Sequence, residues 1–131
     1  MIYHARTRDI LVKVQPEFLE HQSDPANDHY VWSYHVRIEN TGDVAVQLLR
    51  RHWKIIDAFG GEKHVDDDGV VGLQPIIAAG EHFEYNSGTF LKTPSGFMGG
   101  YYEAEDEDGN DHEIEIPVFS LDSPYQAVVL Q

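Results

Sequence analysis

The sequence predicts an all-β protein of the antiparallel β-sandwich class, with about seven to eight strands. Short runs of alternating apolar and polar residues recur along the 131-residue chain, separated by clusters of Gly, Pro, Asn and Asp. No segment of about ten residues or more shows the 3.6-residue period of an amphipathic helix. A small closed barrel is the alternative architecture for the same pattern.

The N-terminal part of the chain contains the clearest strand. Residues 8–14 place Ile10, Val12 and Val14 on one face, whereas the prolines and polar residues of segment 15–28 indicate a loop. In residues 29–41 the alternation is strong, and it predicts one buried face. That face consists of Tyr30, Trp32, Tyr34, Val36 and Ile38. The turn sequence at 40–43 then predicts a β-hairpin with the following run.

Residues 44–59 are long for one strand, and their alternation changes parity. Val46 and Leu48 share one parity, while Trp53 and Ile55 have the other. Such a change requires an extra residue, so we expect a β-bulge or a break within residues 49–52. Bulges often redirect side chains beside functional sites. The side chains redirected here would be Arg50, Arg51 and His52.

The C-terminal half predicts three further strands. Residues 82–91 carry an interruption at 86–88, and residues 97–105 contain a Gly99–Gly100 pair that permits close backbone approach or a kink. An acidic hairpin tip is expected around 108–110. The last strand should place Ile114, Ile116 and Val118 on one face, and Pro117 makes it an edge strand or a bulged one. Trp53 and Ile116 are expected to join the core. We predict one domain over residues 1–124 and a C-terminal tail over 125–131.

Composition narrows the possible functions. The chain has 9 Lys and Arg residues against 23 Asp and Glu residues, a formal net charge of −14. Long-range repulsion from a phosphate backbone therefore disfavours nucleic acid as a partner. The absence of cysteine excludes a disulfide framework and a thiolate zinc site. We see no signal peptide and no membrane span, and we expect a cytoplasmic protein.

Several long motifs resemble one known family. They read RRHWKIIDAFG, HVDDDGVVGLQP, TPSGFMGGYY and IPVFSL, and the resemblance to the ApaG (CorD) family extends over residues 2–124. It implies a fibronectin type III-like, immunoglobulin-like sandwich without catalytic activity. It also implies a bacterial cytoplasmic protein linked genetically to cobalt tolerance and magnesium efflux. Related domains in eukaryotic proteins suggest a protein-interaction module.

A basic cluster and a glycine loop form the predicted site. It consists of Arg50, Arg51, His52, Gly69, Val70, Val71 and Gly72. We expect the bulge to turn both arginines toward the same end of the sandwich as the following loop, so that the two form one surface. Val70 and Val71 should pack inward or cover the core, and an acidic protein partner should bind this surface. Trp53 could anchor such a partner, but we favour a place for it in the core. The alternative for the two arginines is that they pair with nearby acids such as Asp57 and Asp66.

The same surface offers a second function, binding of a small anion such as phosphate or pyrophosphate. The family loop usually reads Gly-x-Gly-Val-Val-Gly and has been compared with phosphate-binding loops. Here Asp67 occupies the first glycine position and places a carboxylate where an anion would approach. No helix pattern follows Gly72, so the context of a dinucleotide-binding loop is missing.

A third candidate function is weak divalent-metal binding by the acidic loops. Neither loop matches an EF-hand, because alignment on Gly109 puts Ala104 first and alignment on Gly69 puts His64 first. Solvated hairpin tips are the better interpretation. We therefore predict a non-catalytic binding module with a protein partner, no cofactor and no metal site. Pro117 and the apolar residues of 128–130 also suggest a homodimer.

Overall fold

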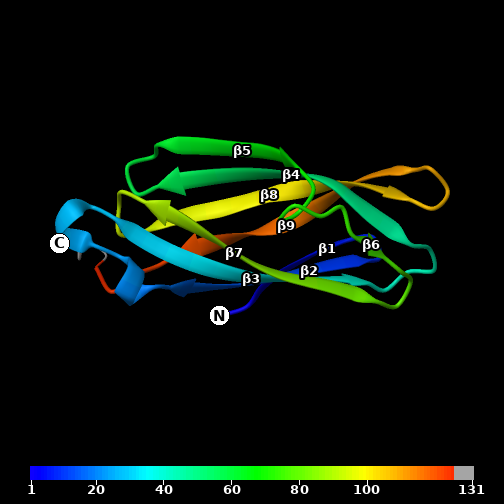
Figure 1. The fold of residues 1–131 in the computed structure, drawn as a ribbon, viewed down its shortest axis with the longest axis horizontal. Coiled ribbons are helices and arrows are strands. Elements are labelled where there is room, and N and C mark those ends of the chain that lie inside the picture. The colour runs from blue at the N-terminus through cyan, green and yellow to red at the C-terminus, as the bar shows by residue number, and fades with distance from the viewer. Residues whose placement is uncertain (126–131) are drawn as a thin grey trace.

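The computed structural model describes residues 1–125 and shows two antiparallel sheets packed face to face. The sheets appear as two layers in Figure 1. The first has the order β1 (Tyr3–Thr7), β2 (Ile10–Phe18), β3 (Tyr30–Asn40), β7 (His82–Leu91). The second has the order β5 (Glu62–Asp68), β4 (Val46–Asp57), β8 (Gly96–Asp106), β9 (Asp111–Leu121), and the two-residue β6 (Ile76–Ile77) also pairs with β4. The predicted all-β sandwich is confirmed.

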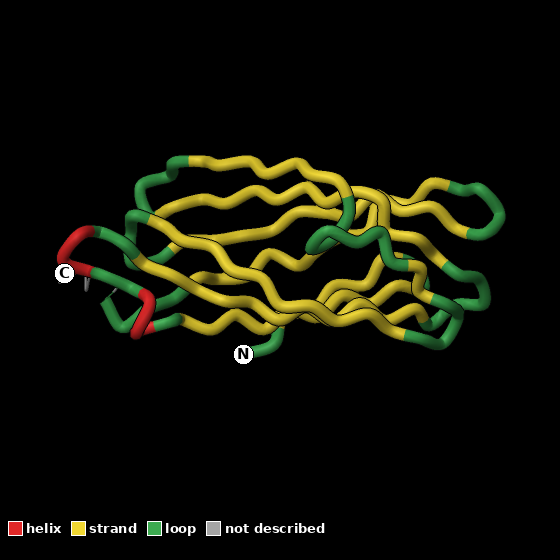
Figure 2. Tube along the Cα trace, viewed as in Figure 1, coloured by secondary structure: helices red, strands yellow, loops and turns green. Residues whose placement is uncertain are grey.

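Two three-residue 3-10 helices, η1 (Glu20–Gln22) and η2 (Pro25–Asn27), connect β2 to β3. Figure 2 places both at one end of the sandwich, near the last described residues. At that end the Tyr125 ring packs against Phe18 and Tyr30, and its hydroxyl donates to Glu20. The rest of the predicted tail, including 128–130, lies outside the described residues. No helix in residues 1–125 has the length and apolar character needed to cross a bilayer.

The core lies between the two sheets and contains the side chains that the alternation predicts. All seven core residues expected from the sequence are buried: Tyr30, Trp32, Tyr34, Val36, Ile38, Trp53 and Ile116. Tyr34 joins the layers, because its ring centroid lies 5.4 Å from that of Trp53 and 5.9 Å from that of Phe119. Aromatic packing of this kind adds about 0.5–1.5 kcal/mol per pair beyond the area buried.

The predicted hairpin after β3 is wrong, because β3 and β4 belong to different sheets. The 40–43 turn carries the chain across the sandwich and is held by the buried Asn40 side chain. Its Nδ2 donates to the carbonyl oxygens of Val44 at 2.8 Å and Ile77 at 3.0 Å, and its Oδ1 accepts from Gly42 N. Turn residues therefore mark a change of direction, but they do not decide which strands pair.

The N-terminal strands are longer than expected. The predicted loop over 15–28 is wrong in its first part, because β2 continues through Pro16 to Phe18. Val14 is the last residue of β2 that pairs with β1, so one side of β2 is unpaired at Pro16, where a strand tolerates proline. The sequence reading also missed β1 as a separate strand.

Two details of the C-terminal strands also differ from expectation. β7 is continuous through the predicted interruption, with Asn86, Ser87 and Gly88 all paired to β3. In β9, Ile114 and Ile116 face inward as predicted, but Val118 is exposed. The reason is a register shift between Met98 and Gly100, which places Pro117 and Val118 together opposite Gly99. Both expectations for Pro117 hold, because β9 is an edge strand and is bulged there.

Candidate functional site

The candidate site begins at the predicted bulge in β4, which lies between Leu48 and Arg50. The extra residue is Leu49, and the segment that links β5 to β6 hydrogen-bonds to it. Leu49 O accepts hydrogen bonds from Gly69 N at 2.7 Å and from Gln74 Nε2 at 3.1 Å. Pro75 O accepts from Leu48 N at 3.0 Å. The bulge therefore holds both ends of a loop over residues 69–75, which we call the glycine loop.

The glycine loop is closed by a tight turn from Val70 to Leu73. Val70 N donates to Leu73 O at 2.6 Å, and Leu73 N donates to Val70 O at 2.9 Å. Val71 and Gly72, the two central residues, have φ angles of 49° and 79°, as in a type I′ turn. This backbone suits Gly72 but is unfavourable for Val71, because a β-branched residue at positive φ is a steric outlier.

The two valines of the loop point in opposite directions. Val70 is fully buried and anchors the loop in the core, whereas Val71 and Leu73 are each 56% exposed. The expectation that both valines pack inward or cover the core is therefore right for Val70, whereas more than half of the Val71 side chain is exposed to solvent. Gly69 has φ 65°, and a Cβ there would lie 2.3 Å from Leu73 O, so this position requires glycine. The loop presents an apolar pair on a fixed backbone.

Arg51 braces the loop from the side of β4. Its Nη1 donates to Gly69 O at 2.9 Å and to Asp68 O at 3.3 Å, and its Nη2 lies 3.3 Å from Asp67 Oδ2. The Arg51 guanidinium thus bonds to the chain that leads into the loop. Three N–H groups of the loop, at Gly69, Val70 and Leu73, donate to carbonyl oxygens.

Arg50 and His52 lie on the outer face of the sheet, on the side opposite to Arg51. Arg50 Nη1 lies 2.7 Å from Asp68 Oδ1, and Arg50 Nε lies 3.3 Å from Glu103 Oε2. The expectation that both arginines turn toward one surface is wrong. Past the bulge the strand alternates normally, so consecutive side chains face opposite sides.

His52 is held between two carboxylates and an aromatic ring. Its Nε2 lies 2.7 Å from Glu103 Oε2, its Nδ1 lies 2.5 Å from Asp66 Oδ1, and its ring stacks on Tyr101 with centroids 4.4 Å apart. The hydrogen bond with Glu103, followed by that with Asp66, raises the pKa of His52. Both ring nitrogens donate only in the imidazolium form, so this arrangement favours the charged side chain.

The acidic tip of the β8–β9 hairpin is organised by its own hydrogen bonds. Asp106 Oδ1 accepts from Asp108 N and Asn110 N, and Asp106 Oδ2 lies 2.7 Å from His112 Nε2. The bond with His112 is the largest cause that lowers the pKa of Asp106 to about 2. Within residues 1–125, no group of three or more His, Asp or Glu side chains is placed to hold a metal ion.

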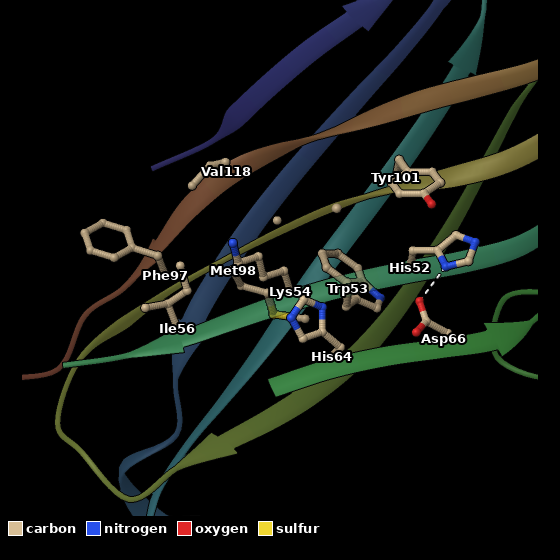
Figure 3. A pocket seen from close by; sticks show the side chains of 12 residues that line it. His52, Trp53, Lys54, Ile56, His64, Asp66, Phe97, Met98, Tyr101 and Val118 are labelled. Carbon is tan, nitrogen blue, oxygen red and sulfur yellow. Dashed lines mark hydrogen bonds and ion pairs between the residues drawn. The ribbon is translucent and has the colours of Figure 1, made fainter. Parts of the chain in front are cut away.

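The sequence reading missed a groove on the outer face of the β5–β4–β8–β9 sheet, with a volume of about 490 Å³. It lies where Gly99 and Gly100 carry no side chains, beside the exposed Phe97 and Val118 (Figure 3). The glycine pair was the available signal. The glycine pair opens a groove on the outer face only because β9 is bulged opposite it, and alternation alone does not locate that bulge.

Fold and site together define a small β-sandwich domain with an apolar loop braced on a bulged strand. The sequence model of the ApaG domain matches residues 20–106. Protein ApaG of Paramagnetospirillum magneticum is 55% identical over 125 residues, which cover 95% of this chain and 96% of that protein. Protein ApaG of Parvibaculum lavamentivorans is 53% identical over 124 residues, 95% of each chain.

Solved structures agree with these sequence comparisons. The crystal structure of a Bordetella pertussis protein described as ApaA matches with a TM-score of 0.86 at 44% identity. The match covers 90% of this chain and 96% of that one. This chain belongs to the ApaG domain family.

Proposed function

We propose that this domain is a non-catalytic protein-binding module and that the tip of the glycine loop contacts the partner. The observation that carries the proposal is Val71, a β-branched residue with φ 49° and a side chain that is 56% exposed. A residue in this conformation costs about 1–3 kcal/mol, and such strain collects at functional sites. The strained residue presents its side chain to solvent beside Leu73, so its apolar surface is available to a partner.

The surroundings of the loop support a preorganised contact surface. Val70 is buried beneath the tip, Leu49 O holds the loop at Gly69 and Gln74, and Arg51 bonds to Gly69 O. A loop held in its bound conformation loses little entropy on association, which favours affinity. Arg51 therefore acts as a brace for the loop and only secondarily as a contact.

The proposal has a cellular setting that comes from the family resemblance. We place the module in the cytoplasm, where its effects on cobalt tolerance and magnesium efflux would pass through the bound protein. The net charge of −14 favours a protein over a nucleic acid as partner.

A homodimer remains part of the proposal, and sedimentation equilibrium across the micromolar range tests it. A species that stays monomeric would remove it.

Affinity capture with matched variants tests the loop proposal. The full chain, Leu73→Ser and Phe59→Ser are immobilised separately and exposed to one bacterial lysate, after their unfolding midpoints have been compared. Phe59 is exposed and lies outside the glycine loop, so it controls for the loss of surface apolar area. Proteins retained by wild type should be lost from Leu73→Ser and kept by Phe59→Ser. Equal retention by all three baits would contradict the proposal.

A further inference from the structure

The outer groove, defined by its apolar walls Ile56, Phe97, Tyr101 and Val118, is a second surface that the glycine loop does not explain. Figure 3 shows Phe97 and Val118 toward one end and Tyr101 and His52 toward the other. The polar groups of the lining come from His52 and Lys54 of β4 and from His64 and Asp66 of β5. Both β4 side chains are paired with carboxylates, Lys54 with Glu62 and His52 with Asp66 and Glu103. The groove volume of about 490 Å³ is within the range of sites that accept a large side chain or a small ligand.

The groove exists because β8 lacks side chains where β9 is bulged. A Cβ at Gly100 would lie 1.8 Å from His52 O, so only glycine allows β8 to approach β4 there. Gly99 pairs with Lys54 and is skipped in the register with β9, which leaves a gap in the outer face. Because the gap is set by backbone pairing, the groove is present before any ligand binds.

The rim of the groove is apolar on a face that sandwich domains normally keep polar. Val118 is 66% exposed and Phe97 is 53% exposed, and they come from neighbouring strands. Neighbouring exposed apolar side chains around a groove are typical of interaction surfaces, whereas single ones are not.

Beyond Tyr101, the same face continues into a ladder of carboxylates. Glu103 lies directly opposite Glu113, and Glu105 lies directly opposite Asp111, across the β8–β9 pair. All four are exposed, and they share the outer face because the residues that alternate with them, such as Ala104 and Ile114, are buried. Like charges directly opposite one another destabilise a sheet. Glu103 is paired with Arg50 and His52, whereas Glu105, Asp111 and Glu113 form no ion pair with any residue in 1–125. A cationic partner would offset the charge of these three carboxylates, so the charge pattern specifies the sign of the partner.

We infer that the outer groove and the acidic ladder together bind an extended, positively charged protein segment. One bulky apolar side chain of the segment occupies the groove over Gly99. Lysine or arginine side chains, placed along the segment, form charge-assisted hydrogen bonds with Glu105, Asp111 and Glu113. The negative field of the face raises the association rate of such a segment. This site is independent of the glycine loop and goes beyond the function proposed for it.

A random nonapeptide display library, panned on the full chain, tests the inference. Wild type, Phe97→Ala and Phe90→Ala are panned in parallel. Phe90 is the matched control, because it is 52% exposed against 53% for Phe97 and lies on β7, away from the groove. Unfolding midpoints of the three proteins are measured first. Leu73→Ser is added as a fourth bait, because peptides bound in the groove should not depend on the glycine loop.

The expected peptides bind wild type, Phe90→Ala and Leu73→Ser alike and lose about tenfold or more in affinity on Phe97→Ala. They should carry a net positive charge and one bulky apolar residue, and Glu113→Gln should weaken them. Three results would overturn the inference. The first is that the groove-dependent peptides are neutral or acidic. The second is that no selected peptide depends on Phe97. The third is that Phe97→Ala abolishes self-association of the protein in the absence of any peptide. The last result would assign the groove to a second copy of the chain.

Discussion

Arg50, Arg51 and His52 are consecutive in sequence but serve two different surfaces. Arg51 faces the glycine loop and bonds to Gly69 O, while Arg50 and His52 share Glu103 on the outer face. The extra residue in β4 sets which of them faces which side. A basic cluster in a sequence is therefore not one patch when it lies in a strand, and each side chain must be assigned to a face before it is given a role.

His52 makes stability depend on pH in a direction that its contacts define. Its pKa in the folded state is raised, first by Glu103 and then by Asp66, above an unfolded value of about 6.5. Its stabilising contribution is thus complete below about pH 6.5 and is lost as pH rises through the raised pKa. We expect the difference in unfolding free energy between wild type and His52→Gln to shrink as pH rises above about 6.5. Chemical denaturation at each pH measures it. A difference that grows with pH would refute this reading of the contacts.

At the scale of elements, two bulges shape both candidate surfaces. The bulge in β4 receives the glycine loop, and the bulge in β9 opens the outer groove opposite Gly99. Gly100 belongs to β8, the strand between β4 and β9, and allows β8 to approach β4 closely. The strand pairing thus builds the sites, and the exposed side chains complete them.

Gly100→Ala should therefore disrupt the β4–β8 pair. The added Cβ would lie 1.8 Å from a backbone oxygen that cannot move without breaking the ladder. We expect a loss of about 3 kcal/mol or more in unfolding free energy. Gly99→Ala is the matched control, since its Cβ would meet the exposed Val118 side chain at 3.0 Å and Val118 Cα at 3.3 Å, contacts that a shift of a few tenths of an ångström relieves. It should cost less than about 1 kcal/mol. Similar losses for the two variants would show that β8 does not depend on close approach at Gly100.

Sequence alternation identified the elements better than it identified their partners. The bulge in β4 followed from the opposite parities of Val46 and Trp53, and the structure has it between Leu48 and Arg50. The β3–β4 hairpin failed because pairing is decided by the packing of distant strands, and a local turn carries no information on it. The exposure of Val71 was missed because a β-branched residue has no intrinsic preference for positive φ. The hydrogen bonds between Val70 and Leu73 impose the positive φ on Val71.

At the scale of the molecule, charge is the dominant property of the surface. The net charge of −14 creates self-repulsion that opposes folding, and the ladder of Glu103, Glu105, Asp111 and Glu113 concentrates it on one face. The ion pairs of the protein, such as Lys54 with Glu62, are largely exposed and contribute little each. Repulsion should outweigh attraction in the response of the domain to salt.

Raising NaCl from about 20 mM to about 300 mM should therefore raise Tm, because the Debye length shortens and repulsion is screened. A double variant, Glu105→Gln with Glu113→Gln, should start from a higher Tm at low salt and gain less from added salt. Calorimetry at several salt concentrations measures both. A fall in Tm on addition of salt would mean that surface ion pairs outweigh repulsion.

Val71→Gly tests the central claim most directly, because it separates the stability of the loop from its proposed function. Glycine accepts φ 49° without strain, and its extra entropy in the unfolded chain offsets part of the gain. Unfolding free energy should rise by about 1 kcal/mol. Capture of the partner by the same protein sample should fall, since the exposed side chain is gone. A more stable variant with full capture would contradict the account, because the strained valine would then serve no binding function.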